Sequence, residues 1–545
     1  MQEIQAKIKN AIKILYDIDF DPDFSPAPDN IDADYSSNAP LKLAKELHKP
    51  PMEIANELAE AIENTTVSAP GFLNFNLPNE YLSEQITKLS TNFRENISSD
   101  EYSGKIIICE FSDPNPFKVL HVGHLYTSIV GDSISRLFEY AGAKVIRANF
   151  GGDVGLHVAK TLYILEQKNY EDFTIEDIAK CYVEGTAAYE DSEEAHAKIT
   201  ELNKKIYQIN SANLHDSKLA ELYWKGRELS YDYFKDFYAQ IGVHFDKFYP
   251  ESTVADLGLE KVRAELEKGV YEMSNGAVIF NGEKFGLHTR VFINKEGVPT
   301  YETKDVGLLF TKWQDYHFDK SVVITGSEQL DYMEVVLKSV EQYAPELVEK
   351  TSHLTHGLVK LPGNVKMSSR KGNFLKAVDV LNMVKDELKS AYDSSDEIVA
   401  LAATKYAFLR YKMGGNIVFD PKESVKMTGN SGPYLLYSAV RAKKILQKSS
   451  NNQPAKNTAY NTYEKNLIKK ILEYKNVLKE AVAEMAPHKV ASYLYELAQE
   501  FSRFYEHCPV AGSDREAERA TLVKVYLDTM THGLNILGIN IPEEM

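Results

Sequence analysis

The first hundred residues contain two stretches in which apolar side chains recur every three or four positions. This spacing places them on one face of a helix. One stretch opens the chain, the other follows Pro50-Pro51, and turn-rich segments lie between and after them. The apolar positions are Ile4, Ile8, Ala11, Ile12 and Leu15 in the first stretch and Ile54, Leu58, Ala61 and Ile62 in the second. We therefore predict a small α+β domain over residues 1–100.

The next region alternates between strand and helix patterns. Residues 105–111 (KIIICEF) form a short run of β-branched side chains, residues 122–140 have helical spacing, and residues 144–150 again read as a strand. This order predicts a βαβ unit. A third apolar strand, residues 321–325, comes only after a long stretch of mostly helical and polar sequence. A large insertion should therefore separate the two halves of the sheet.

From about residue 400 the helical pattern continues to residue 545. Its apolar stripe contains Leu467, Ile468, Ile471, Leu472 and Leu478, and its one obvious internal loop is residues 449–462. This part of the chain predicts an all-α bundle.

Composition narrows the classes of protein that remain. The chain has 545 residues, of which 43% are hydrophobic and 26% charged, and we see no apolar run of membrane-spanning length and no signal peptide. We therefore expect a cytoplasmic protein of several domains. The net charge of −17 argues against indiscriminate nucleic-acid binding, so any RNA contact must use local basic patches. The three cysteines, Cys109, Cys181 and Cys508, are far apart and suggest neither a zinc site nor a disulfide.

A His-Val-Gly-His segment stands where the first predicted strand leads into the first helix. Backbone N–H groups at such a helix start can face an anion, Gly123 admits a nucleotide closely, and His121 and His124 can donate hydrogen bonds to phosphate. Two histidines that merely cap a helix are the alternative interpretation.

A cationic loop lies far downstream. Its residues are Lys366, Met367, Ser368, Ser369, Arg370 and Lys371. Three cations among small residues suit a loop that neutralises a triphosphate as pyrophosphate leaves. Alone, this segment would more simply be a solvated basic loop.

Together the two segments resemble the paired signatures of class I aminoacyl-tRNA synthetases, and further segments resemble the arginyl-tRNA synthetase family. These segments are residues 70–75, 110–115, 145–149, 301–307, 429–434 and 537–539. The resemblance spans nearly the whole chain. It implies an enzyme that activates L-arginine with ATP and Mg²⁺, in a reaction that requires bound tRNA, and then transfers arginine to the 3′ end of tRNA(Arg). A monomer is our default expectation.

The family's architecture is also implied. Residues 1–100 would form the amino-terminal tRNA-binding α+β domain. Residues 101–400 would form a doubly wound, Rossmann-like parallel-sheet catalytic domain with a helical insertion. Residues 401–545 would form the α-helical anticodon-binding domain.

A guanidinium group is planar, forked and permanently charged, so its receptor should contain carboxylates and a flat neighbour. By resemblance, Glu110 and Asp305 supply the carboxylates, Tyr301 lines the pocket, and Asn115 and Gln329 hold the α-amino group. An ordinary pair at a helix start is the alternative for Tyr301 and Asp305.

The ATP site implied by the resemblance combines the histidine segment, the cationic loop and a ribose-binding corner. The expected ATP-binding residues are His121, Gly123, His124, Gly326, Glu328, Lys366, Met367, Ser368, Arg370 and Lys371. The chain departs from the family at Ser369, where the loop usually carries its second lysine. Lys118 stands where a substitute lysine occurs in many family members, and Arg370 and Lys371 are rival suppliers. The expected catalytic residues are therefore Lys118, His121, His124 and Lys366.

Recognition of tRNA would use aromatic side chains that stack on unpaired bases. The expected contacts are Phe72, Asn74, Tyr434, Tyr437, Tyr505 and Met545, although tyrosines are abundant here and each could instead pack in a core.

Three other functions remain open at this point. A synthetase for another amino acid would not need Glu110 and Asp305 together. A catalytically silent tRNA-binding paralogue would not need His121, His124 and the lysines. A small nucleotidyltransferase would not need the carboxy-terminal bundle.

Overall fold

The computed structural model describes residues 2–28, 31, 33–170, 172–363, 375–449 and 459–545. The chain divides into two compact units. Unit 1 contains residues 1–97, 441–476 and 496–530, and unit 2 contains residues 98–440, 477–495 and 531–545. Both units therefore contain parts of the carboxy-terminal helices.

The amino-terminal part of unit 1 is a four-stranded antiparallel sheet with helices, in the strand order β1-β2-β4-β3. Its elements are α1 (Gln2–Tyr16), β1 (Ser25–Pro26), β2 (Tyr35–Ser37), α2 (Ala39–Leu47), α3 (Pro51–Ala61), β3 (Thr65–Ser68), β4 (Phe72–Phe75), α4 (Asn79–Thr91) and α5 (Phe93–Ile97). Ile8, Ile12, Ile54 and Leu58 are buried as their spacing predicts, but Leu15 is exposed. The apolar face of α1 therefore ends one turn earlier than its pattern indicates.

Four long helices form the carboxy-terminal region, as the sequence predicts. They are α18 (Gly432–Lys448), α19 (Thr462–Ala483), α20 (Pro487–His507) and α21 (Glu516–Ile536). Leu467, Ile468 and Ile471 of the predicted stripe are buried. Within unit 1, the buried Glu464 near the start of α19 pairs with Arg515 and Arg519, each at 2.8 Å.

The centre of unit 2 is a five-stranded parallel sheet in the order β12-β11-β5-β6-β7. These strands are β5 (Ile106–Glu110), β6 (Lys144–Gly151), β7 (Lys247–Pro250), β11 (Lys320–Gly326) and β12 (Thr351–His356). From β5 the chain first adds β6 and β7 on one side and later β11 and β12 on the other. The order therefore reverses between β5 and β11, which confirms the predicted doubly wound class.

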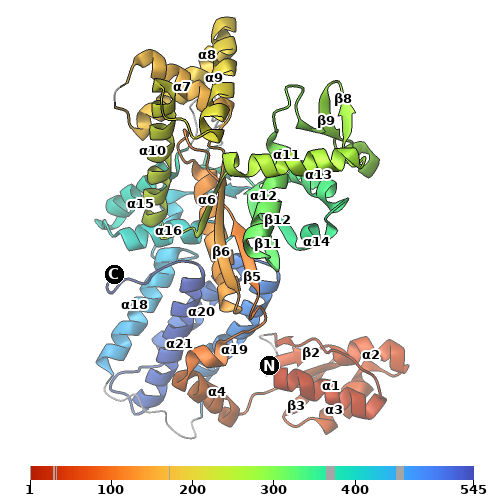
Figure 1. Ribbon diagram of the computed structural model, residues 1–545. Coiled ribbons are helices and arrows are strands. Elements are labelled where there is room, and N and C mark those ends of the chain that lie inside the picture. Colours follow the sequence, from red (N-terminus) through yellow and green to blue (C-terminus); the bar gives the residue numbers. More distant parts are fainter. Residues whose placement is uncertain (1, 29–30, 32, 171, 364–374, 450–458) are drawn as a thin grey trace. The chain divides into compact units, whose positions relative to one another are not determined.

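Helix α6 (Val122–Tyr140) begins and ends at the predicted residues and runs beside β5 and β6 (Figure 1). It approaches the sheet so closely that a Cβ added at Gly131 would lie 2.2 Å from the Phe111 ring. Other helices of the sheet domain are α11 (Glu251–Glu267), α12 (Tyr301–Tyr316), α13 (Leu330–Glu341), α14 (Pro345–Glu349), α15 (Ala377–Tyr392), α16 (Glu397–Leu409) and α17 (Pro421–Ser424). Helices α11 and α12 cross at Gly258 and Gly307, where added Cβ atoms would lie 2.0 Å from facing backbone oxygens.

The region between β6 and β11 is more varied than the predicted helical insertion. Figure 1 shows four helices gathered beyond one end of the sheet: α7 (Leu156–Lys168), α8 (Ile175–Asp191), α9 (Glu193–Ser211) and α10 (Lys218–Gln240). They share an apolar core of their own that includes Leu162, Ile178 and Ile199. Three short strands, β8 (Glu272–Ser274), β9 (Ala277–Phe280) and β10 (Arg290–Ile293), form a separate antiparallel sheet. A further pair is β13 (Val359–Lys360) with β14 (Ile417–Val418).

A buried polar network holds the middle of α6. Asp132 accepts hydrogen bonds from Arg136 (2.7 Å) and Arg147 (3.2 Å). Backbone carbonyls at the end of α21 and just after it are bound from the same region: Ser133 donates to Ile536 at 2.9 Å, and the buried Lys405 of α16 donates to Gly538 at 2.6 Å. Burial lowers the pKa of Lys405 to about 8. The carboxyl-terminal turn of α21 is thereby attached to the parallel-sheet domain.

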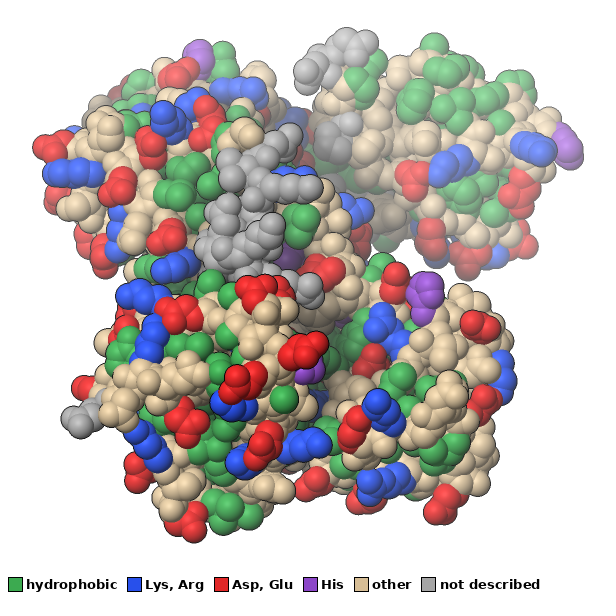
Figure 2. All heavy atoms as spheres, turned by 90° about the horizontal axis from the view of Figure 1, so that it is seen from above, with side chains coloured by type: hydrophobic (Ala, Val, Ile, Leu, Met, Phe, Trp, Pro, Cys, Tyr) green, Lys and Arg blue, Asp and Glu red, His purple; other side chains and the backbone are tan. Residues whose placement is uncertain are grey.

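Surface charges are mixed. Figure 2 shows acidic and basic side chains interspersed over the face in view, and the chain carries a net charge of −17. Among the described residues, no helix is long and apolar enough to cross a membrane, and the three cysteines are buried and unpaired.

Candidate active site

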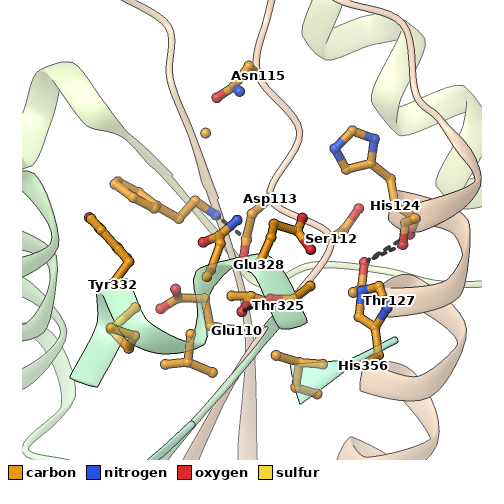
Figure 3. Close-up of a pocket in the computed structure, with 18 of the residues that line it drawn as sticks. Glu110, Ser112, Asp113, Asn115, His124, Thr127, Thr325, Glu328, Tyr332 and His356 are labelled. Carbon is orange, nitrogen blue, oxygen red and sulfur yellow. Dashed lines mark hydrogen bonds between the residues drawn. The ribbon is translucent and has the colours of Figure 1, made fainter. Parts of the chain in front are cut away.

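A cavity of about 730 Å³ opens at the carboxyl ends of β5 and β11, where the strand order reverses. Open parallel sheets bind their ligands at this point. Ten of the candidate residues line it: Glu110, Asn115, His121, Gly123, His124, Tyr301, Asp305, Gly326, Glu328 and Gln329. In Figure 3, His124 and Thr127 lie on one side, Tyr332 lies on the other, and Glu110 and Asp113 lie between them.

One wall of the cavity, the histidine wall, is formed by His121 and His124 at the start of α6. Nδ1 of His121 accepts a hydrogen bond from the Gly123 N–H, and Nδ1 of His124 accepts one from the His121 N–H, each at 3.1 Å. The rings stack with centroids 3.8 Å apart. Burial lowers the pKa of His121 to about 4 and that of His124 well below its usual value. Both rings are therefore neutral near pH 7, and because Nδ1 accepts, the ring proton resides on Nε2.

The opposite part, the carboxyl wall, consists of Glu110, Asp113 and Asp305. Glu110 is the last residue of β5, and its carboxylate accepts a hydrogen bond from Lys312 Nζ at 2.6 Å. Lys312 also donates to Ser321 at 3.1 Å, and both charged side chains of the pair are buried. Asp305, one turn into α12, accepts a hydrogen bond from the Tyr332 hydroxyl.

Burial raises the pKa of Asp305 to about 8, although the Tyr332 hydrogen bond opposes this shift; the nearby charge of Glu110 adds to the rise. Burial also raises the pKa of Asp113 well above its ordinary value, again reinforced by Glu110. Both carboxyls therefore lie in an environment that penalises negative charge and would be relieved by a cation.

The loop after β5 is held to the loop after β6 by side chains. Asp113 Oδ1 accepts the Phe150 N–H at 2.8 Å, and Asn115 Oδ1 accepts the Gly152 N–H at 2.7 Å. A Cβ at Gly152 would lie 2.8 Å from that amide oxygen, so a larger residue there would displace the Asn115 side chain. The amide group of Asn115 is thus fixed at the rim of the cavity.

Two further charged groups border the carboxyl wall. Glu251 is buried and pairs with Lys304 at 2.6 Å. Arg290 lies over the Tyr332 ring, 5.3 Å from its centroid, and donates to Glu302 at 3.4 Å. Tyr301 is exposed at the mouth of the cavity.

The turn after β11 forms the remaining side. A Cβ at Gly326 would lie 2.4 Å from the Glu328 carboxylate, so a glycine is needed for that carboxylate to approach the backbone. Nearby, the Thr325 hydroxyl and His353 Nε2 are 2.7 Å apart. An exposed acid beside a glycine is suited to accept the hydroxyls of a sugar.

Taken together, the cavity offers neutral N–H donors at a helix start on one wall and carboxyl groups on the other. It can therefore hold a ligand or pair of ligands that carries an anion at one end and a cation at the other.

Comparison with known proteins agrees with this chemistry. The family model for "tRNA synthetases class I (R), catalytic domain" matches residues 85–407, more than half of the chain. The chain belongs to the arginyl-tRNA synthetase family. Models for the "Arginyl tRNA synthetase N terminal domain" and the "DALR anticodon binding domain" match residues 2–77 and 435–545.

Individual members of the arginyl-tRNA synthetase family match over all or nearly all of their length. The arginine–tRNA ligase of Fusobacterium nucleatum is 29% identical and that of Flavobacterium psychrophilum 27% identical, with 94% and 100% of this chain and 93% and 100% of those proteins covered. Arginyl-tRNA synthetase structures from Thermus thermophilus (TM-score 0.79, 23% identity) and Plasmodium falciparum (0.77, 21%) share the fold over 100% of this chain and 100% and 99% of those chains.

Some candidate residues lie away from the cavity lining. Lys118 is one of them, and its Nζ lies 4.8 Å from the centroid of the Tyr182 ring. Its charge nevertheless contributes to the lowered pKa of both His121 and His124, so Lys118 is close to the histidine wall. Lys366, Met367, Ser368, Arg370 and Lys371 fall outside the described residues. Their roles in binding ATP therefore remain predictions from the sequence.

The expected tRNA contacts are distributed over both units. In unit 1, Phe72 and Asn74 lie on β4, and Tyr505 is exposed on α20 with Arg441 over its ring. The Asn74 amide is buried between Ser36 and Ser68. In unit 2, Tyr437 and Met545 are exposed, whereas Tyr434 is half-buried against Tyr495. Tyr437, Tyr505 and Met545 are thus the best exposed of the set.

Sequence reasoning missed several residues of the cavity. Asp113, Glu251, Arg290, Tyr332 and His356 line it, and Lys312 stands behind Glu110. Only Asp113 had a usable signal, since it lies inside the segment 110–115 that resembles the family. The others come from distant parts of the chain.

Proposed function

We propose that the chain is an arginine–tRNA ligase, which forms arginyl-adenylate from L-arginine and ATP and then transfers arginine to tRNA(Arg). The observation that carries this proposal is the pairing of the histidine wall and the carboxyl wall in one cavity. In the first step a carboxylate oxygen of arginine attacks the α-phosphorus of ATP and pyrophosphate leaves. In the second, a hydroxyl of the terminal tRNA ribose attacks the arginyl carbonyl and AMP leaves.

Arginine would enter with its guanidinium group against the carboxyl wall. Asp305 and Glu110 attract the cation, Tyr301 covers the mouth, and Asn115 and Gln329 hold the α-amino group. Because the carboxyls are buried, their attraction for a fixed cation is stronger than it would be in water. The opposing end of arginine, its carboxylate, is then directed toward the histidine wall.

ATP would occupy the side formed by α6 and the turn after β11. Glu328 accepts the ribose hydroxyls, and Gly123 and Gly326 allow close approach. His121 and His124 donate from Nε2 to phosphate oxygens, and Lys118 and Lys366 supply positive charge as pyrophosphate departs. No covalent enzyme intermediate is needed, so the rate enhancement comes from positioning and charge stabilisation. Mg²⁺ would arrive with ATP as part of the substrate.

The remaining roles follow the predicted division of the chain. Residues 1–100 and 401–545 would bind tRNA, through Phe72 and Asn74 in the first and Tyr434, Tyr437, Tyr505 and Met545 in the second, around the catalytic residues 101–400. We place the reaction in the cytoplasm, where tRNA is used, and keep a monomer as the default expectation.

The test is ATP–pyrophosphate exchange with each amino acid in turn, with and without total tRNA. Exchange is expected with arginine alone, and only when tRNA is present. Binding of labelled tRNA without exchange for any amino acid would instead identify a tRNA-binding paralogue. Exchange with a different amino acid would contradict the assignment of the carboxyl wall.

A further inference from the structure

Unit 1 joins two parts of the chain that the sequence assigns to different domains. Residues 1–97 belong to the same compact unit as residues 441–476 and 496–530 of the carboxy-terminal bundle. Of the expected tRNA contacts, this unit contains Phe72 and Asn74 on β4 and Tyr505 on α20. The contacts that hold its two parts together therefore determine the spacing between two expected tRNA-binding surfaces.

The central contact is an ion pair between Asp34 and Lys469 of α19. The lysine Nζ lies 3.1 Å from Oδ1, and the side chains of Lys469 and Asp34 are 21% and 10% exposed. Next to Asp34, the buried Tyr35 lies near Glu473 of α19, whose charge adds to the effect of burial in raising the pKa of Tyr35. Removal of either partner of the ion pair would leave a largely enclosed charge without its counterpart, which is costly.

Asp34 is held in place by its own domain, directly before β2. Its N–H donates to the Phe75 carbonyl at 2.9 Å, and its carbonyl accepts the Ala27 N–H at 3.1 Å. Its Oδ2 accepts the Leu77 N–H at 2.7 Å, which leaves Oδ1 for Lys469. The carboxylate therefore presents one oxygen to α19 in a fixed direction.

Two further lysines of the bundle bind backbone carbonyls of the amino-terminal domain. Lys475 of α19 donates to the Asn96 carbonyl at 3.2 Å, and Lys524 of α21 donates to the Ser90 carbonyl at 3.0 Å. Ser90 and Asn96 lie in the last turns of α4 and α5, where carbonyls lack partners within the helix and a positive charge is favourable. We call these two contacts the lysine caps.

We infer that the Asp34–Lys469 pair, supported by the lysine caps, attaches the amino-terminal domain to the bundle so that both surfaces bind one tRNA as a single body. Asp34 and Lys469 are then positioning residues for tRNA. The inference rests on the proposed arginine–tRNA ligase activity and extends it to residues that need not contact RNA. Two surfaces held at a fitting distance bind one ligand more tightly than either surface alone, and this gain falls when one of them moves freely.

The experiment measures tRNA-dependent ATP–pyrophosphate exchange for Asp34→Asn and Lys469→Met over a range of tRNA and salt concentrations. Asparagine keeps an oxygen that can accept the Leu77 N–H, so it removes the charge and retains the local fold. Lys469→Arg keeps the positive charge and serves as the conservative variant.

Asp23→Asn and Lys489→Met are the matched controls. Asp23 pairs with Lys42 inside the amino-terminal domain, and Lys489 pairs with Glu480 and Glu484 inside unit 2, so neither pair joins the two parts of unit 1. The Lys489 side chain is 26% exposed, close to the value for Lys469. Both controls should match the wild type.

Asp34→Asn and Lys469→Met should each raise KM for tRNA by about 5- to 10-fold, because the spacing of the two surfaces is no longer fixed. KM for arginine, KM for ATP and kcat at saturating tRNA should change by less than about twofold. Lys469→Arg should restore KM for tRNA. The sign for Asp34→Asn is informative, since removal of an acid that lies beside RNA would strengthen binding to the polyanion.

A second measurement needs no substrate. Hydrogen exchange in α4 and α5 should become faster in Asp34→Asn and Lys469→Met, because the ends of these helices lose the lysine caps when the domain detaches. Unchanged exchange would mean that the ion pair does not hold the domain, whether or not the chain is a ligase.

Two kinetic results would also overturn the inference. One is an unchanged or lower KM for tRNA in Asp34→Asn. The other is a higher KM in Lys469→Met alone, with the salt dependence of tRNA binding reduced by about one phosphate contact, which would assign Lys469 to direct binding of RNA. Absence of exchange in the wild type is a separate outcome, because it removes the proposed function and the role in tRNA binding with it.

Discussion

The two walls of the cavity are built on opposite electrostatic principles. At the histidine wall, burial lowers the pKa values of His121 and His124, so the rings are uncharged and act as N–H donors. At the carboxyl wall, burial raises the pKa values of Asp113 and Asp305, so the ionised forms of these acids are stabilised when a cation binds. The same physical cause, removal from water, thus produces a receptor for phosphate on one side and for guanidinium on the other.

The largest effect is expected at the histidine wall. His124→Ala should reduce the rate of arginyl-adenylate formation by about 10²- to 10³-fold, the range for loss of one preorganised donor to a developing negative charge. KM for arginine should change little. His215→Ala is the control, since that ring lies against Trp224 outside the cavity. The check is a pre-steady-state measurement of the rate of arginyl-adenylate formation. If His124→Ala mainly weakened arginine binding, the assignment of the histidine wall to ATP would be wrong.

The next prediction concerns the cation that serves the histidine wall. Lys118→Ala should slow activation by about 100-fold, because its charge lies near both histidines and would stabilise the leaving pyrophosphate. Arg370→Ala and Lys371→Ala should each have an effect below about threefold. Lys118→Arg, which keeps the charge, should recover part of the rate. Equal losses in the three alanine variants would reject Lys118 as the substitute for the lysine missing at Ser369.

A pH profile tests the carboxyl wall without mutation. Asp305 attracts the guanidinium only when ionised, and its pKa is raised to about 8. KM for arginine should therefore fall by up to about tenfold per unit as the pH rises from 6 towards 8, and then level off. Asp305→Asn should have a higher KM and a flatter profile. A KM that rises with pH in this range would show that the acids are not the guanidinium receptor.

The smallest effect is expected outside the cavity. Tyr505→Ala should raise KM for tRNA by about 5- to 10-fold through loss of stacking on a base, with no change in KM for arginine or ATP. Tyr392→Ala is a control, because Tyr392 is equally exposed and is not an expected tRNA contact. A change in arginine affinity in the Tyr505 variant would mean that the two walls depend on this residue as well.

Much of the catalytic sheet domain could be predicted from sequence because its signals are local. The β-branched run of β5, the start of α6 at the histidines and the apolar run of β11 each depend on neighbouring residues. Strand β7 was missed, since its four residues, Lys247–Pro250, carry no alternating pattern. Its place is determined by pairing with β6.

The candidate site was predictable only where a motif marks it. The histidine pair and the segment 110–115 are contiguous in sequence. Lys312, in contrast, lies 202 positions after Glu110, on helix α12, and it bonds both Glu110 of β5 and Ser321 of the paired strand β11. Such pairs depend on the register of the sheet and leave no trace in either local sequence, and for that reason the neutralisation of Glu110 appears only in the structure.

The attachment of α6 to residues 535–538 has a consequence for synthesis of the chain. Ser133 finds its partner carbonyl 403 positions later, at Ile536, and Lys405 binds Gly538. During translation α6 can form its helix early. Ser133 in its middle, however, has no access to its partner carbonyl until Ile536 has been synthesised. A chain released before residue 535 would therefore carry both histidines and still have an unsupported catalytic helix. The helix that carries both histidines therefore depends on residues more than 400 positions later for its support.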